Sequence, residues 1–347
     1  MGRIPLKSPF ENRGFGLCCL ALFFLVGISS SAMSQEPPES SANSKLNLPT
    51  KTLGGKQFWT DVRFQGGWKI QQNALTGHFR LLDKSKVRRA WGTLAACQNV
   101  LDRAINDGTV KPTSGRVVIV LHGLIRTSNS MGVVGKYLQK NSNMTAISYE
   151  YASTRKSVKQ HAESLGQLID GLGKEVTEIN FVGHSMGNIV VRRYLFAETK
   201  GDRQGDPRIK RMVMIGPPNQ GSQMALMLKK NFIFKVVAGA AGAQMGETWE
   251  HLAKKLAIPK FEFGIIAGGQ SDENQRFSNM FVDGKDDFTV GVEETKLAGA
   301  TDFLVKPLLH STMMKQPVTL KATLSFLEHG YFTTKSARQP LPSEPKK

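Results

Sequence analysis

Short apolar runs that alternate with helical segments constrain the fold of this chain more than any other feature. Six runs end at glycine or a polar residue, as buried strands do: 117–123, 144–150, 178–183, 211–216, 262–268 and 302–306. Segments with helical spacing of apolar residues lie between or after them: 130–139, 157–172, 186–197 and 320–327. This alternation predicts an α/β fold with a mostly parallel sheet and helices on both faces.

The segment before this alternation has a different pattern. Three short runs, 57–64, 68–72 and 76–82, predict antiparallel strands. A helix is expected next, around Cys97, with these apolar residues on one face: Trp91, Leu94, Leu101 and Ile105. On such a face, Cys97 is expected to be a buried and unreactive thiol.

One strand-to-helix transition carries a serine between glycines. The stretch Gly183-His184-Ser185-Met186-Gly187 follows an apolar run and opens the helix predicted at 186–197. A turn between a strand and a closely crossing helix leaves no room for Cβ atoms two residues before and after the serine. The pattern predicts a nucleophile elbow with Ser185 as nucleophile.

A serine nucleophile needs a base and an acid that orients it, and both should follow strands. His310 lies in the loop after the run 302–306, whereas His251 lies in a helical segment and His329 ends a helix. His310 is therefore the expected base. The acid is expected between 268 and His310, and four residues are candidates: Asp272, Asp283, Asp286 and Asp287. Asp287, directly before Phe-Thr-Val, is the choice that best fits the motif.

Two backbone N–H groups should stabilise the oxyanion of the reaction. The first is expected from Met186, the residue after the nucleophile, and the second from Leu124, in the loop after the run 117–123. Gly123 permits the turn at the end of the run 117–123, directly before Leu124.

These pieces carry a resemblance to a known family. VVIVLHGL, INFVGHSMGNIVVRRYL, MIGPPNQGS, DDFTVGVEETKL and DFLVKPLLHSTMM occur in the order nucleophile, acid, histidine, and span about 116–329. The chain resembles α/β-hydrolases, and among them serine lipases and esterases with a class 2 lipase or glycosylphosphatidylinositol-deacylase-like core. The resemblance implies an α/β-hydrolase domain at 53–332 with a lid or cap insertion at about 223–259.

The same resemblance implies an activity. The expected reaction is hydrolysis of carboxylic esters, with lipid-like substrates, through an acyl-enzyme on Ser185, His310 and Asp287, without a cofactor or metal. An acyltransferase, thioesterase or amidase would use the same triad. A non-catalytic module that binds lipid or an envelope polymer is a third hypothesis.

The two ends and the charge predict where the protein acts. Residues 1–32 have basic residues, a short apolar run and small residues, which is typical of a cleaved secretory signal and predicts a secreted or periplasmic protein; a retained membrane anchor is the alternative. Residues 33–52 are expected to be a linker and 333–347 a tail. The net charge of +18 is consistent with peripheral contact with an anionic membrane surface. Nucleic acid is not an expected partner, because no motif for it occurs.

Overall fold

The computed structural model describes residues 56–200, 205–221, 241, 244, 249–269, 287 and 289–343. The signal peptide expected at 1–32 and the linker expected at 33–52 lie outside these residues, as does most of the lid expected at 223–259. Within the described ranges, no helix combines the length and the apolar character needed to cross a membrane.

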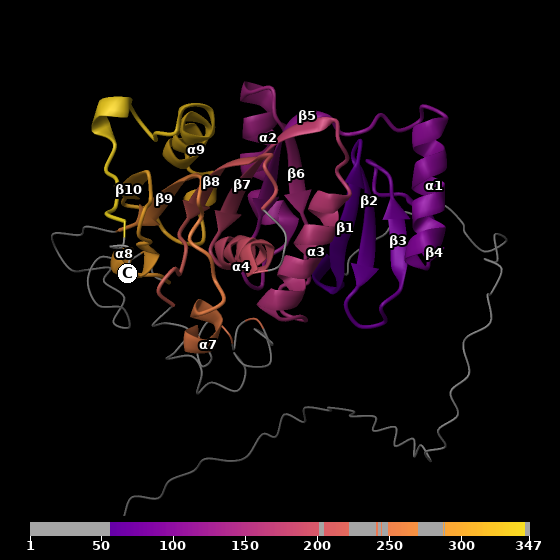
Figure 1. The fold of residues 1–347 in the computed structure, drawn as a ribbon, viewed down its shortest axis with the longest axis horizontal. Coiled ribbons are helices and arrows are strands. Elements are labelled where there is room, and N and C mark those ends of the chain that lie inside the picture. Colours follow the sequence, from indigo (N-terminus) through magenta and orange to yellow (C-terminus); the bar gives the residue numbers. More distant parts are fainter. Residues whose placement is uncertain are drawn as a thin grey trace, which may run out of the picture. The chain divides into compact units, whose positions relative to one another are not determined.

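A six-stranded parallel sheet forms the centre of the described fold, which confirms the predicted α/β class (Figure 1). Its order is β10-β9-β8-β7-β5-β6. The strands are β5 (Gly115–Leu121), β6 (Thr145–Tyr149), β7 (Val176–His184), β8 (Ile209–Ile215), β9 (Glu262–Gly268) and β10 (Asp302–Lys306).

Strands β9 and β10 have the predicted bounds, whereas β5, β7 and β8 each begin two residues earlier. Each of these three strands has a polar residue as its second position: Arg116 in β5, Thr177 in β7 and Lys210 in β8. A search for apolar runs therefore begins each strand after this residue.

Two pairs of helices cover the two faces of this sheet (Figure 1). Helices α3 (Val158–Asp170) and α4 (Met186–Lys200) pack on the face that includes Ile119. Helices α2 (Gly132–Asn141) and α9 (Pro317–His329) pack on the face that includes Val118. Side chains alternate between the two faces of a strand, and helices cover both faces of this sheet. Both faces are therefore buried, as the continuous apolar runs predicted.

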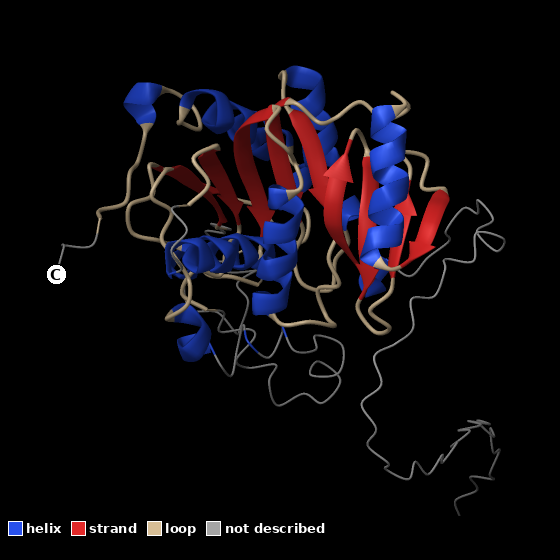
Figure 2. Ribbon diagram, turned by 45° about the vertical axis from the view of Figure 1, so that its right-hand side comes forward, coloured by secondary structure: helices blue, strands red, loops and turns tan. Residues whose placement is uncertain are grey.

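A separate four-stranded antiparallel sheet precedes the parallel sheet, and helix α1 lies across it (Figure 2). Its strands follow the chain order, β1 (Trp59–Gln65), β2 (Trp68–Asn73), β3 (Phe79–Leu82) and β4 (Arg88–Gly92), and α1 spans Leu94–Asn106. Val62, Ile70 and Leu81 from the sheet pack against Cys97 and Leu101 from the helix.

The helix face predicted for this region is wrong at Trp91. Trp91 lies on β4 with 49% of its surface exposed, and α1 begins only after Thr93, whose side chain accepts a hydrogen bond from Ala96 N. The sequence does not predict strand β4 because Arg88 and Arg89 leave it without an apolar run. Cys97 is buried as predicted, and burial raises the pKa of its thiol to about 11, which keeps it protonated.

The two sheets meet where β1 passes the end of β6 (Figure 1). Asp61 N donates to Glu150 O at 2.9 Å, Glu150 N donates to Asp61 Oδ2 at 2.9 Å, and Ala152 N donates to Thr60 Oγ1 at 3.2 Å. These contacts attach the antiparallel sheet to the carboxyl end of an edge strand of the parallel sheet.

The C-terminal part contains shorter elements. Helices α7 (Trp249–Ala253) and α8 (Val292–Thr295) lie on either side of β9 in the sequence. Helix α9 begins at Pro317, three residues before the predicted start, because proline fits the first turn of a helix, where its missing N–H has no partner to lose. Of the expected tail, Gln339 N bonds to Asp302 Oδ1 and Leu341 N bonds to Ala300 O.

Candidate active site

Ser185 occupies the turn between β7 and α4 with a backbone conformation that residues other than glycine rarely adopt. Its φ angle is +53°, in the left-handed region, and the residue is half-buried. The turn is held by backbone hydrogen bonds on both sides: Ser185 N donates to Ile215 O at 2.9 Å, and Asn188 N donates to Ser185 O at 3.1 Å. A serine on a tight turn between a strand and a helix is the geometry predicted from the sequence, and its left-handed φ angle is a further finding.

The flanking glycines are required by close approach, as predicted. A Cβ atom on Gly187 would lie 2.8 Å from His122 O and 2.9 Å from Leu121 O. One on Gly183 would lie 2.2 Å from Asn188 Oδ1. Helix α4 therefore starts in contact with the end of β5, which brings the loop after β5 to the serine.

His310 and Asp287 are in direct contact. His310 Nδ1 lies 2.7 Å from Asp287 Oδ2, and His310 N donates to Asp287 O at 2.9 Å. Because the ionised carboxylate only accepts, the proton of this hydrogen bond belongs to Nδ1, which leaves Nε2 as the acceptor of the neutral ring. Asp287 Oδ1 accepts from Val290 N at 2.7 Å and Thr289 N at 3.0 Å.

The other candidate acids, Asp272, Asp283 and Asp286, lie outside the described residues. Asp287 is fully buried in the loop that follows β9, and His310 is in the loop that follows β10. Both therefore lie at the carboxyl edge of the sheet, where ligands bind in parallel α/β folds.

His310 and Ser185 are linked through His184, the last residue of β7. His184 Nε2 donates to His310 O at 3.0 Å, and the two rings are 4.7 Å apart between centroids. Burial, with the neighbouring His310 second, lowers the pKa of His184 well below its ordinary value, so this ring is neutral. A neutral His184 supports His310 without repelling the positive charge that a base acquires.

The described residues form no hydrogen bond between Ser185 Oγ and His310. Such bonds are often long in structures without substrate and tighten when it binds. The structure thus brings His310 to Asp287 as a bonded pair and places the pair next to the elbow.

The loop after β5 crosses directly over the serine. A Cβ atom on Gly123 would lie 3.0 Å from Ser185 Cβ, so Leu124 follows at the position expected for an oxyanion donor. Ile125, the next residue, has φ +61°, an outlier for a β-branched side chain. Met186 opens α4, where N–H groups have no partner within the helix.

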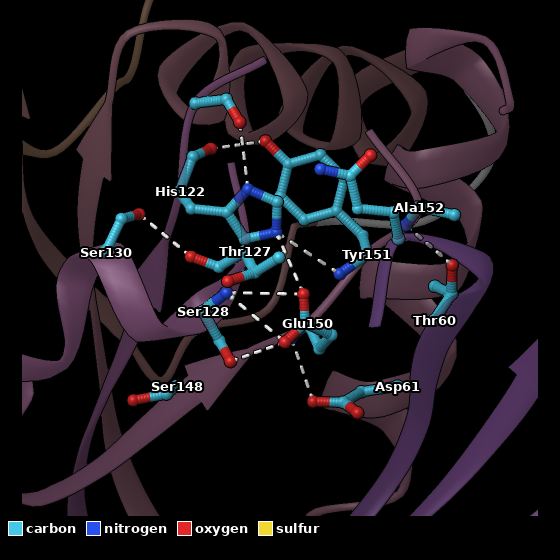
Figure 3. Close-up of polar contacts among 12 residues, drawn as sticks. Thr60, Asp61, His122, Thr127, Ser128, Ser130, Ser148, Glu150, Tyr151 and Ala152 are labelled. Carbon is cyan, nitrogen blue, oxygen red and sulfur yellow. Dashed lines mark hydrogen bonds and ion pairs between the residues drawn. The ribbon is translucent and has the colours of Figure 1, made fainter. Parts of the chain in front are cut away.

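Figure 3 shows a buried polar cluster behind this loop. His122 is fully buried, its Nδ1 lies 2.9 Å from Gly123 O, and its Nε2 lies 3.5 Å from Glu150 Oε1. The Tyr151 hydroxyl donates to His122 O. The sequence motifs do not predict Glu150 and Asp61 as residues near the site. Glu150 could have been found because, like His122, it comes directly after a parallel strand.

Comparison with known proteins places the chain in a family. The family model described as "Alpha/beta hydrolase of unknown function (DUF915)" matches residues 96–329, about two thirds of the chain. The chain belongs to this α/β-hydrolase family. The α/β-hydrolase fold and superfamily expected from the sequence are thereby confirmed. Strands β1 to β4 lie outside the matched residues.

Solved structures are similar at low sequence identity. The propeptide form of the Bacillus licheniformis lipase BlEst2 is 16% identical with a TM-score of 0.49; the match covers 68% of this chain, which spans about half (53%) of that protein. The metagenomic carboxyl esterase MGS0156 is 14% identical with a TM-score of 0.46, covering 60% of this chain and 70% of the esterase. Phospholipase PlaB from Legionella pneumophila is 17% identical with a TM-score of 0.41, covering 53% of this chain and 46% of PlaB. No curated protein matches the chain significantly.

Proposed function

We propose that this α/β-hydrolase family member is a serine hydrolase that cleaves carboxylic esters through an acyl-enzyme. The observation that carries the proposal is the bonded pair of His310 and Asp287, 2.7 Å apart, beside a serine with a φ angle of +53° on the turn at the edge of the sheet. Together with Leu124 and Met186, these residues match the parts that acyl transfer requires.

The proposed reaction begins with attack by Ser185 Oγ on the ester carbonyl, while His310 Nε2 takes the hydroxyl proton. Asp287 holds the other ring nitrogen and stabilises the imidazolium that forms. The N–H groups of Leu124 and Met186 bind the oxyanion of the tetrahedral intermediate. His310 then returns the proton to the alcohol that leaves.

The second half of the reaction repeats these roles with water. His310 takes a proton from the water that attacks the acyl-enzyme and returns it to Ser185, which releases the carboxylic acid. An acceptor alcohol or amine in place of water would make the protein an acyltransferase, and a thioester or amide substrate would use the same groups.

The substrate is proposed to be a lipid-like ester, met outside the cytoplasm. The support for location is the pattern of basic and apolar residues in 1–32, and the support for contact with an anionic membrane surface is the net charge of +18.

Initial rates on p-nitrophenyl esters of increasing acyl length test the proposal. Ser185→Ala is expected to lower kcat by about 10⁴-fold or more, because both half-reactions pass through this oxygen. Ser164→Ala is the matched control: Ser164 is a buried serine of α3 whose hydroxyl donates to Gln160 O of its own helix. Equal activity of Ser185→Ala and the parent protein on every ester would refute the proposal.

A further inference from the structure

Asp61 connects the N-terminal sheet to the parallel sheet through buried hydrogen bonds. It lies on β1, outside the residues matched by the family model, and is fully buried. Its carboxylate accepts from Lys69 Nζ at 2.6 Å, from Gln71 Nε2 at 2.6 Å and from Glu150 N at 2.9 Å. Its own N–H donates to Glu150 O at 2.9 Å. Asp61 therefore holds both backbone groups of Glu150.

The Glu150 side chain joins the two ends of the loop that follows β5 (Figure 3). One end is His122, whose Nε2 lies 3.5 Å from Glu150 Oε1. The other end is Ser128, whose N–H lies 3.2 Å from both carboxylate oxygens and whose hydroxyl donates to Oε2 at 2.5 Å. Burial alone would raise the pKa of Glu150, but hydrogen bonding and charge at His122, with hydrogen bonds from Ser128, outweigh it and lower that pKa. The bridge is therefore anionic at neutral pH.

His122 in turn orients the peptide unit that precedes Leu124. A carbonyl oxygen only accepts, so the 2.9 Å contact between His122 Nδ1 and Gly123 O requires a proton on Nδ1. Gly123 C=O and Leu124 N–H belong to one planar trans peptide and point in opposite directions. Fixing this carbonyl toward His122 therefore fixes the direction of the Leu124 N–H.

A second contact from the N-terminal region reaches the same loop. Gln57 Nε2 donates to Ile125 O at 3.1 Å. Ile125 is the residue at φ +61°, and such strained conformations persist only where surrounding contacts determine them. The loop is thus held at its centre by Gln57 and at both ends through Glu150.

We propose that the N-terminal sheet is part of the catalytic apparatus: Asp61, acting through Glu150 and His122, is a positioning residue that keeps the Leu124 N–H directed at the oxyanion. This inference rests on the ester hydrolysis proposed above. The antiparallel sheet then has a role in turnover as well as in packing, although it lies outside the residues that define the family.

Asp61→Asn tests the proposal, with Asp83→Asn as its matched control. The Asp61 carboxylate accepts hydrogen bonds from all three of its partners, Lys69 Nζ, Gln71 Nε2 and Glu150 N. The NH₂ group of an asparagine would therefore face one of these donors without an acceptor. The same holds for Asp83, a buried carboxylate after β3, which accepts from Ser85 N, Val87 N and Arg89 Nε. The two substitutions therefore remove similar bonds from one sheet, and only Asp61 contacts Glu150.

Both variants are made in the full chain, their folding is followed by circular dichroism and thermal unfolding, and kcat and KM are measured on the best p-nitrophenyl ester. Asp61→Asn is expected to lower kcat about tenfold or more and to change KM less than about threefold. The reason is that the Leu124 N–H contacts the oxyanion, whose charge develops in the transition state. Asp83→Asn is expected to lower Tm while kcat stays within about twofold of the parent. Unchanged kcat in Asp61→Asn, or an equal fall in Asp83→Asn, would overturn the proposal.

Two further measurements keep the proposal testable if Asp61→Asn does not fold or if no ester is turned over. Gln57→Ala removes one partly exposed contact and is expected to lower kcat about threefold or more. Amide hydrogen exchange of residues 122–128 needs no activity: exchange should be faster in Asp61→Asn, or in Gln57→Ala if the former does not fold, than in Asp83→Asn. Equal exchange would refute the positioning role, whereas failure of the hydrolase proposal would appear as an inactive parent protein with the exchange difference intact.

Discussion

Among the described residues, three other than glycine have φ in the left-handed region; two lie at the proposed site, and the third, Lys86, lies between β3 and β4. Ser185 and Ile125 both have φ near +60°, and they lie on the two loops that meet at the carboxyl edge of the sheet. A conformation of this kind costs about 1–3 kcal/mol and is kept where it orients a reacting group.

Asp287 can be separated from an ordinary buried carboxylate by substitution. Asp287→Asn is expected to lower kcat by about 10³- to 10⁴-fold, because the amide no longer holds His310 in the tautomer that leaves Nε2 free. Steady-state rates on the best ester measure this effect.

Asp302→Asn is the control for that prediction. Asp302 is also buried and accepts three backbone hydrogen bonds, from Phe303 N, Phe332 N and Gln339 N. Its substitution should cost about 1–3 kcal/mol of the free energy of unfolding and leave kcat of the folded protein nearly unchanged. A comparable loss of kcat in both variants would show that Asp287 acts only on stability.

At the scale of elements, the parallel sheet gathers the site because its strands end at one edge. His122 follows β5, Glu150 follows β6 and Ser185 follows β7, and these three strands are neighbours. His122 and Glu150 thus share one buried cluster, and Ser185 lies beside the loop that follows His122. Helix α3 closes the cluster from the other side, with the His161 ring 4.8 Å from that of Tyr151.

Helix α3 makes stability depend on pH through His161. Burial, with the charges of His122 and Lys156 second, lowers the pKa of His161 to about 3 in the folded protein. The unfolded chain binds this proton below about pH 6.5, so stability is complete above that pH and falls as pH drops toward 3. The expected loss is about 1.4 kcal/mol per pH unit, or about 2–3 kcal/mol between pH 6 and 4.

Urea unfolding of His161→Leu at pH 6, 5 and 4 measures this contribution. The variant should lose less stability than the parent over that interval, by up to about 2–3 kcal/mol. Ser164→Ala, at a buried residue of the same helix without an ionisable group, should keep the dependence of the parent. Parallel curves for His161→Leu and the parent would contradict the assignment.

At the scale of the whole molecule, most of the parallel sheet was predictable, because its strands are buried on both faces and appear as continuous apolar runs. The elbow was predictable because the close crossing of β7 and α4 excludes Cβ atoms at positions 183 and 187. The sequence accordingly has glycine at both positions.

The antiparallel sheet and the cluster behind the loop were less predictable. Strand β4 has one buried residue, Ala90, among arginines, so no apolar run marks it. Asp61 and Glu150 are 89 residues apart, and a carboxylate in a sequence does not show whether its partners are water or buried donors. Only the fold brings these two residues together.

The central claim is that Ser185 is a nucleophile activated by His310. The most direct test is reaction of the full chain with a fluorophosphonate, followed by mass spectrometry of the labelled peptide. We expect one covalent adduct on Ser185, none in Ser185→Ala, and much slower labelling in His310→Ala. Labelling that persists in Ser185→Ala, or that proceeds at the parent rate without His310, would contradict it.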